Sequence, residues 1–366
     1  MKPSNACNTI PSRPLRGALA ALVGAILMSG AAVAATPTYR IVLLPELPDT
    51  GHSAAYAISD AGQIVGSASD LASGTYAISW GTAPYAPQPL ASLAPHTTVA
   101  WAVNDAGVVV GNAGLDFGSL AVLWDPSGAI VELGDLPRGP LQSSANDING
   151  SGVAVGQGTS SQGRVGPVFW TVPGQTRKLG PALYSGLAEA VNDFGDVAGY
   201  YTSGRPAFVT HAARWRVGRQ WMQDLGDLPG GSDFSKAYGI NDARQVVGTS
   251  QSDLGARAVL WSSDGSMTDL GDLGDGSSYV ALDINEAGNI VGRYETSVTR
   301  RGFLWTATDG MRDLYDLIDP ADPLRAQFGA DFVNIEAINA SGLIVGTMYP
   351  DPEDLNPHAI VLVPQE

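Results

Sequence analysis

The sequence predicts an all-β protein, a seven-bladed β-propeller closed by pairing of its N-terminal and C-terminal strands. Three observations predict it. One segment recurs seven times, a tryptophan follows it in six of the seven copies, and a strand-like orphan segment precedes the first copy. The composition agrees, because 45 glycines and only 15% charged residues in 366 suit short strands and turns rather than long helices.

The recurring segment has the form Ile/Val-Asn-Asp-x-Gly-x-Val-Val-Gly, and its second residue is here termed the anchor. Successive anchors lie 45, 45, 43, 49, 44 and 54 residues apart. A glycine stands seven residues after every anchor, and another stands three residues after all but one, where Arg244 replaces it. Glycines at fixed offsets indicate a structural repeat. The anchors of repeats one to seven are Ser59, Asn104, Asn149, Asn192, Asn241, Asn285 and Asn339.

The pattern within each repeat of about 45 residues predicts four short strands, and four strands are the content of one propeller blade. The first strand ends at the anchor, where Asn-Asp-x-Gly is typical of a turn, and the Val-Val-Gly run is the second. The third carries Trp80, Trp124, Trp170, Trp215, Trp261 or Trp305, with Leu362 in the seventh repeat. The fourth is expected at Leu-Gly-Asp-Leu segments such as Leu133 to Leu136, Leu225 to Leu228 and Leu270 to Leu273, with a looser copy at Leu314 to Leu317.

The two ends of the chain favour a closed structure. Residues 40–47 form an extra copy of the fourth element, whereas the seventh repeat stops after its third element at residues 359–362. Together they would complete one blade and leave no exposed sheet edge. An open β-solenoid is the alternative, if the early segment pairs elsewhere.

The first 34 residues have the pattern of a signal peptide. Three basic residues precede an unbroken apolar run from Gly17 to Met28, and Ala32-Val33-Ala34 is a small-x-small cleavage site. An uncleaved membrane anchor is the alternative, which the many alanines and glycines of the run disfavour. We therefore expect a signal peptide at 1–34, a single propeller domain at 35–366, and a secreted or periplasmic protein without a membrane span after cleavage.

Charge and cysteine content limit the partners. Removal of the leader, which has three basic residues and no acid, changes the formal net charge from −16 to −19. A protein with this much negative charge repels nucleic acids and anionic lipids. We therefore expect no nucleic-acid partner. The only cysteine, Cys7, lies in the leader, and the mature fold must be stable without disulfides.

The repeats resemble the probable extracellular repeat family HAF of bacterial secreted proteins, named for a His-Ala-Phe segment before the tryptophan. His211-Ala212 and His358-Ala359 keep the His-Ala part, and Asp224 to Gly231 best keeps the Asp-Leu-Gly-x-Leu-x-Gly-Gly part. The similarity extends from Tyr39 to Val363. It implies a secreted repeat protein, and it supplies no catalytic residue and no cofactor.

Acidic residues supply the candidate cation sites. The carboxylates of the fourth element could form a partial ring that holds a cation or a sugar hydroxyl, although aspartate between glycine and leucine more often caps a turn. Two loop clusters could bind calcium, although each is more typical of a solvated loop. The fourth-element acids are Glu46, Asp135, Asp227, Asp272 and Asp316, and the two clusters are Asp319, Asp322 and Asp331, and Asp351, Glu353 and Asp354.

One basic patch interrupts the acidity of the chain. It consists of Arg205, His211, Arg214, Arg216 and Arg219 around Trp215 and Trp221. Arginine beside tryptophan can bind a carboxylate or a sugar. The alternative is an outward strand face whose arginine stems cover apolar surface.

Two functions are weighed against these patterns, and a third, a purely structural role as a surface or matrix component, is also compatible with them. The favoured one is a non-enzymatic binding or interaction module for an unknown extracellular protein or glycan. The alternative is a polysaccharide-active propeller hydrolase or lyase that uses two carboxylates in the channel. Zinc is disfavoured, since the four histidines are far apart in sequence and the mature chain lacks cysteine. A Ser-His-Asp triad stays open, but no motif supports it, so we assign no catalytic, cofactor-binding or metal-binding residue.

Overall fold

The structure is a computed structural model that describes residues 37–70, 74–93, 97–171, 173–181, 184–204, 209–274, 278–296, 300–330, 333–349 and 356–365. The expected signal peptide at 1–34 lies outside these residues. Among the described residues, no helix has both the length and the apolar character needed to cross a membrane.

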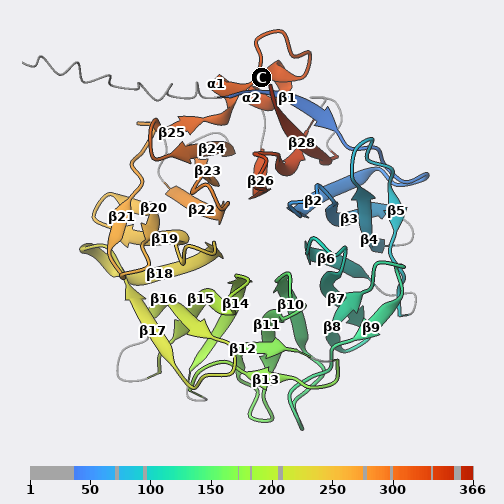
Figure 1. Cartoon of the computed structure of the whole chain (residues 1–366), viewed down its shortest axis with the longest axis vertical. Helices are drawn as coiled ribbons and strands as arrows, with labels where there is room; N and C mark the ends of the chain where they lie inside the picture. Colours follow the sequence, from blue (N-terminus) through green and yellow to red (C-terminus); the bar gives the residue numbers. More distant parts are fainter. Residues whose placement is uncertain are drawn as a thin grey trace, which may run out of the picture. The chain divides into compact units, whose positions relative to one another are not determined.

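The strands follow the fourfold pattern of the repeats, and Figure 1 shows them in chain order. The first strands are β2 (His52–Ile58), β6 (Thr98–Val103), β10 (Ser143–Ile148), β14 (Ser185–Val191), β18 (Gly230–Ile240), β22 (Ser278–Ile284) and β26 (Asn334–Ile338). The second are β3 (Ile64–Asp70), β7 (Val109–Leu115), β11 (Ala154–Thr159), β15 (Asp196–Thr202), β19 (Val246–Ser252), β23 (Ile290–Glu295) and β27 (Ile344–Met348).

The third strands carry the tryptophans in the first six repeats and Leu362 in the seventh. They are β4 (Gly74–Gly81), β8 (Gly118–Trp124), β12 (Val165–Trp170), β16 (Thr210–Arg216), β20 (Gly255–Trp261), β24 (Arg300–Thr306) and β28 (His358–Gln365). The fourth are β5 (Gln88–Pro89), β9 (Ile130–Glu132), β13 (Arg177–Lys178), β17 (Met222–Gly226), β21 (Met267–Asp269), β25 (Gly310–Asp313) and, for the last sheet, β1 (Thr38–Leu43).

Strands of one repeat pair antiparallel in the order first, second, third and fourth. The first three repeats and the seventh form four-stranded sheets, whereas short parallel contacts of β16 with β18 and of β20 with β22 join repeats four to six. In the last sheet β1 pairs with β28 from Thr38↔Gln365 to Leu43↔Ile360. Figure 1 shows these two strands side by side, so the orphan segment supplies the strand that the seventh repeat lacks.

The predicted fourth strand is displaced in several repeats. In repeats two and five it ends at Glu132 and Asp269, before the Leu-Gly pair, because Gly134 and Gly271 adopt positive φ and turn the chain. The copy at Leu314–Leu317 is a helical turn, α1, rather than a strand, since the Asp313 carboxylate caps it by accepting the Tyr315 N–H at 2.9 Å. A second short helix, α2 (Arg325–Ala330), follows in the connection to β26.

Each first strand contains a β-bulge three residues before the anchor. In β2, for example, pairing with β3 skips from Ala55 to Ala57, so Tyr56 bulges out of the ladder. Gly66 pairs with Ala55 beside the bulge, and a Cβ on Gly66 would overlap the backbone oxygen of Ala54. The glycine seven residues after the anchor is therefore required by the bulge. The bulged residues are Tyr56, Trp101, Asn146, Glu189, Tyr238, Leu282 and Glu336.

The core lies between the sheets of successive repeats. Trp124 of the second repeat packs with Val65 and Ala77 of the first, and its indole N–H donates to the Ala91 backbone oxygen at 2.7 Å. The Val-Val runs of the second strands are buried on both faces, as expected for strands with a neighbouring sheet on each side. One buried tryptophan per repeat therefore fills each of these interfaces in the first five repeats.

Hydrogen bonds link the anchors of successive repeats. Each asparagine anchor donates from Nδ2 to the backbone oxygen of the next anchor, as Asn104 does to Asn149 at 3.0 Å. Asn339 continues the series to the Ser59 oxygen at 3.1 Å, across 280 residues of chain. The side chain of Ser59 has no amide group, so the corresponding asparagine hydrogen bond from repeat one to repeat two cannot form.

Candidate binding site

All seven bulged residues line one cavity of about 350 Å³. The anchor turns complete its wall, so every repeat contributes to it. Because a bulge re-aims a side chain out of the regular sheet, the fold brings seven positions that are about 45 residues apart into one site. These positions differ in chemistry from repeat to repeat, whereas their neighbours in sequence are nearly constant.

The cavity wall is strongly acidic. Its carboxylates come from the residues that follow the anchors, from bulged positions and from the positions between the two. No lysine, arginine or histidine lines it among the residues that the structure describes. The cavity therefore concentrates negative potential and favours cations. The nine lining acids are Asp60, Asp105, Asp147, Glu189, Asp193, Asp242, Asp283, Glu286 and Glu336.

The acids after the anchors are fixed by backbone groups of the preceding repeat. Asp193 accepts the Gly150 N–H at 2.7 Å, and Asp242 accepts the Asp193 N–H at 2.9 Å. Asp60 accepts the Ala340 N–H at 2.7 Å, which joins the seventh repeat to the first. These side chains are thus held in place before any ligand binds.

Asp147 and Asp283 lie deeper and stabilise the bulges. Each accepts its following backbone N–H and a second one from the next repeat, Val191 N–H at 2.7 Å for Asp147 and Ile338 N–H at 2.9 Å for Asp283. Burial raises the pKa of Asp147 to about 7 and that of Asp283 to about 6, although the backbone hydrogen bonds act in the opposite direction.

The bulged side chains supply the varied chemistry of the site. The rings of Tyr56 and Trp101 lie 4.7 Å apart at 38°, and Trp101 is held by a 2.7 Å hydrogen bond from its indole N–H to Asn112 Oδ1. Burial raises the pKa of Glu189 to about 7, opposed by the charge of Lys236. Aromatic faces beside carboxylates suit ammonium groups and hydroxyl-rich ligands.

The fourth-element acids do not line this cavity, and each has its own surroundings. Glu46 pairs with His358 at 2.8 Å, and Asp272 with Arg257 at 2.9 Å. Asp135 is half-buried, which raises its pKa, and Asp316 lies in the first turn of α1. Glu46 and Asp272 therefore form local ion pairs, whereas Asp227 belongs to a separate cluster with His211.

The calcium candidates are only partly within the described residues. Asp322 is buried and accepts the Ile41 and Leu324 N–H groups, both at 2.8 Å, so it fixes the connection after α1 to β1. Asp319 accepts the Ala321 N–H at 2.8 Å. Both residues thus have structural roles as turn and strand contacts. Asp331, Asp351, Glu353 and Asp354 lie outside the described residues.

Part of the predicted basic patch lines a second cavity of about 350 Å³, to which neither His211 nor Trp215 contributes. Trp221 is 45% exposed at its edge, whereas Trp215 is buried in the core on the opposite face. Arg214 is buried and donates to Gln223 Oε1 at 2.7 Å. The lining residues are Asp196, Arg214, Arg216, Arg219, Trp221 and Arg244, while Arg205 lies outside the described residues.

Both alternatives for this patch find support in its contacts. Asp196 pairs with Arg244 at 2.8 Å and with Arg216 at 3.5 Å, so part of the arginine charge is satisfied within the protein. One carboxylate still faces four guanidinium groups, which leaves a net positive cavity suited to an anion. Arg244 was not expected here, because it comes from the turn of the next repeat, where it replaces glycine at φ +62°.

Comparison with known proteins identifies the fold but no family. No family model and no curated protein matches the chain. Among solved structures, the β-propeller domain of the Trilobed protease from Pyrococcus furiosus matches with a TM-score of 0.55 and 8% identity, over 87% of this chain and 96% of that one. Streptogramin B lyase matches with a TM-score of 0.54 and 9% identity, over 90% and 98%.

A third match is a catalytically inactive virginiamycin B lyase from Staphylococcus aureus with quinupristin, with a TM-score of 0.51 and 11% identity, over 89% of this chain and 99% of that one. At such low identities these likenesses concern the fold alone. The chain is an all-β protein that resembles β-propellers, as the repeat pattern predicts. The resemblance to the HAF family stays a prediction.

Proposed function

We propose that the protein is an exported HAF-type β-propeller of seven blades, closed by β1 and β28, that acts as a non-enzymatic binding module in the periplasm or outside the cell. The residue pattern at 1–34 supports export. The pairing of β1 with β28 and the hydrogen bond from Asn339 to Ser59 support closure. The contribution of all seven repeats to one cavity supports a central binding site.

The observation that carries the binding role is the acid-lined cavity with its three bulged aromatic residues, Tyr56, Trp101 and Tyr238. A ligand with positive charge would gain attraction from the carboxylates and contact with the aromatic faces. We therefore expect the segment of the partner that enters the cavity to carry amines, on a glycan or on a protein.

Isothermal titration of the mature protein with glucosamine oligomers tests this role, with fully acetylated oligomers and a lysine-containing peptide as the comparison ligands. Binding of an amine-bearing ligand should fall at least about fivefold in Trp101→Ala and in Asp193→Asn, which remove one aromatic face and one charge at the cavity. Trp221→Ala, an exposed aromatic outside the cavity, is the matched control and should bind normally. Equal affinity of all variants, or no binding of any amine-bearing ligand, would refute the proposal.

A polysaccharide-active hydrolase or lyase is the second candidate. The observation that favours it is the position of Glu189 in the cavity wall. Burial raises the pKa of Glu189 to about 7, which is in the range of a general acid. Incubation with polysaccharides, read out as new reducing ends or unsaturated products, tests it. Turnover that is lost in Glu189→Gln would support catalysis, and turnover by neither protein would leave the binding role.

A further inference from the structure

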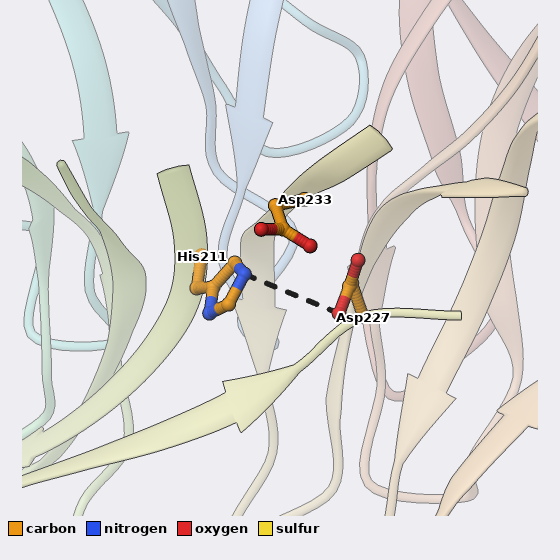
Figure 2. A group of neighbouring side chains, drawn as sticks. All are labelled: His211, Asp227 and Asp233. Atoms are coloured by element: carbon orange, nitrogen blue, oxygen red, sulfur yellow. Dashed lines mark ion pairs between the residues drawn. The ribbon is translucent and has the colours of Figure 1, made fainter. Parts of the chain in front are cut away.

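A second charged cluster lies away from the cavity, where the third strand of repeat four meets the first strand of repeat five. His211 in β16, Asp227 after β17 and Asp233 in β18 place one imidazole nitrogen and two carboxylate oxygens within 4.8 Å of one another. Figure 2 shows the two carboxylates facing the same edge of the His211 ring, with His211 Nε2 and Asp227 Oδ1 4.0 Å apart. Small movements of Asp227 and of the exposed Asp233 would bring the three ligand atoms to the spacing of about 3.4 Å that a tetrahedral metal ion imposes.

The histidine is oriented by a third carboxylate. His211 Nδ1 lies 3.0 Å from Asp224 Oδ2, and Asp224 also accepts the Tyr201 hydroxyl and the Gly226 N–H, both at 2.8 Å. Asp224 thus acts as the acceptor in both of these hydrogen bonds, and the ring nitrogen that faces it is placed to donate. The Nδ1 atom therefore carries a proton, and the lone pair of a neutral imidazole lies on Nε2.

The Nε2 atom is the unexplained part of the cluster. It is buried, and no hydrogen-bond partner reaches it among the residues that the structure describes. A histidine that binds a metal usually has its other ring nitrogen hydrogen-bonded to a carboxylate. His211 has this arrangement, because Asp224 contacts Nδ1 while Nε2 faces the cluster with Asp227 and Asp233.

The equivalent positions in other repeats show what this place in the fold ordinarily holds. Four residues before the tryptophan stand Arg257 in repeat five and Arg301 in repeat six. Arg257 binds Asp269 at 3.0 Å and Asp272 at 2.9 Å, the counterparts of Asp224 and Asp227. Arg301 binds Asp313 at 3.0 Å. In those repeats a guanidinium supplies the positive charge that the fourth-element acids face.

Repeat four lacks that cation and has an additional acid. His211 replaces the arginine, and Asp233 adds a carboxylate from the N-terminal part of β18. Repeat seven also has a histidine, but His358 Nδ1 contacts Glu46 directly at 2.8 Å, and no third ligand joins that pair in a metal-sized cluster of the described residues. Within the part of the chain that the structure describes, the donor set of one imidazole and two carboxylates therefore occurs at one place.

We propose that His211 Nε2, Asp227 and Asp233 bind a divalent transition-metal ion such as Zn²⁺, with Asp224 as the positioning residue. One imidazole with two carboxylates suits zinc or manganese better than calcium, which prefers oxygen ligands alone. In repeat four, the ion would supply the positive charge that Arg257 and Arg301 supply in repeats five and six. It would also join β16 to β18, two strands of successive repeats. It would thereby stabilise the contact between repeats four and five.

Titration of the mature protein, purified without a histidine tag, with ZnCl₂ tests the site. We expect one Zn²⁺ per chain and a rise of the melting temperature on binding. His211→Arg should abolish binding yet fold normally, because arginine occupies the same position in repeats five and six. Asp227→Asn should also abolish binding, and Asp224→Asn should weaken it about 10- to 100-fold.

His52→Ala is the control that removes a histidine from β2, and it should bind zinc as the unaltered protein does. Wild-type protein that binds no Zn²⁺ at 100-fold excess would overturn the proposal. So would binding of equal stoichiometry and affinity in His211→Arg, since the ion would then lie elsewhere.

Discussion

At the scale of single residues, the anchor asparagine has two tasks. Its Oδ1 caps the turn of its own repeat, as Asn104 does by accepting the N–H groups of Ala106 and Val108, while its Nδ2 binds the next repeat. Ser59 performs only the first task, since its hydroxyl accepts the Gln63 N–H at 3.2 Å. The turn can thus form without asparagine, but the link between repeats cannot.

Ser59→Asn should therefore stabilise the protein. The new amide would donate to the Asn104 oxygen, which adds about 1 kcal/mol to the free energy of unfolding, the net value of one hydrogen bond. Asn104→Ser is the matched reverse change and should lower stability by a similar amount. Urea unfolding followed by tryptophan fluorescence measures both. If Ser59→Asn leaves stability unchanged while Asn104→Ser lowers it, repeats one and two do not face each other as the other repeats do.

At the scale of the element, the β-bulge is the feature that brings one side chain of every repeat to the common cavity. It explains why the glycine seven residues after the anchor never varies and why the residue three before the anchor varies freely. The first is confined by the backbone of its partner strand, and the second projects into the cavity. Positions that the fold confines and positions that face the cavity therefore lie within the same short segment.

Gly111→Ala tests the bulge. A methyl on Gly111 would overlap the Val99 backbone oxygen, so the bulge must open, and we expect a loss of several kcal/mol in the free energy of unfolding. Gly128→Ala is the control: Gly128 has φ +83° but open space around it, and its replacement should cost only about 1 kcal/mol. Thermal unfolding of the two variants distinguishes them, and equal losses would mean that conformation alone explains both glycines.

The sequence predicts the positions that the fold confines, but not the positions that face the cavity. The anchors, glycines and tryptophans could be predicted because they recur. The cavity could not, since Tyr56, Glu189 and Leu282 share no chemistry that would mark them as members of one site. Their common offset from the anchor was the available signal. The His211 cluster was not predicted for a related reason. Asp224 and Asp227 belong to the recurring fourth element, so nothing marks them as metal ligands, and Asp233 becomes their neighbour only when β18 lies beside β16.

At the scale of the whole molecule, the acids of the cavity make stability depend on pH. Asp147, Asp283 and Glu189 have pKa values of about 7, 6 and 7 in the folded protein, above their ordinary values of 3.8 to 4.5. Between roughly pH 4 and 7 the folded state therefore binds more protons than the unfolded state. The contribution of these three groups to stability is therefore present at low pH and is lost as the pH rises through this window to about 7.

We expect the melting temperature to be several degrees higher at pH 5 than at pH 8. Glu189→Gln removes one of the responsible charges at constant size, so it should raise the melting temperature at pH 8 and reduce the difference between the two pH values. Asp264→Asn, at an exposed turn, should leave that difference nearly unchanged. A protein that is more stable at pH 8 than at pH 5 would contradict the assignment of buried carboxylates to the cavity.

Closure of the last sheet by both ends of the chain is the central claim, and a designed disulfide tests it most directly. Arg40 in β1 lies directly opposite Val363 in β28, and directly opposite strand residues are within disulfide range. The only native cysteine lies in the predicted leader, so Arg40→Cys with Val363→Cys gives a mature chain with one possible internal pair. If the two strands pair, the cysteines should oxidise within one chain, leave no free thiol, and stabilise the protein by up to about 5 kcal/mol relative to its reduced form. Free thiols, or cross-links only between chains, would show that β1 does not pair with β28 and would contradict closure of the last sheet.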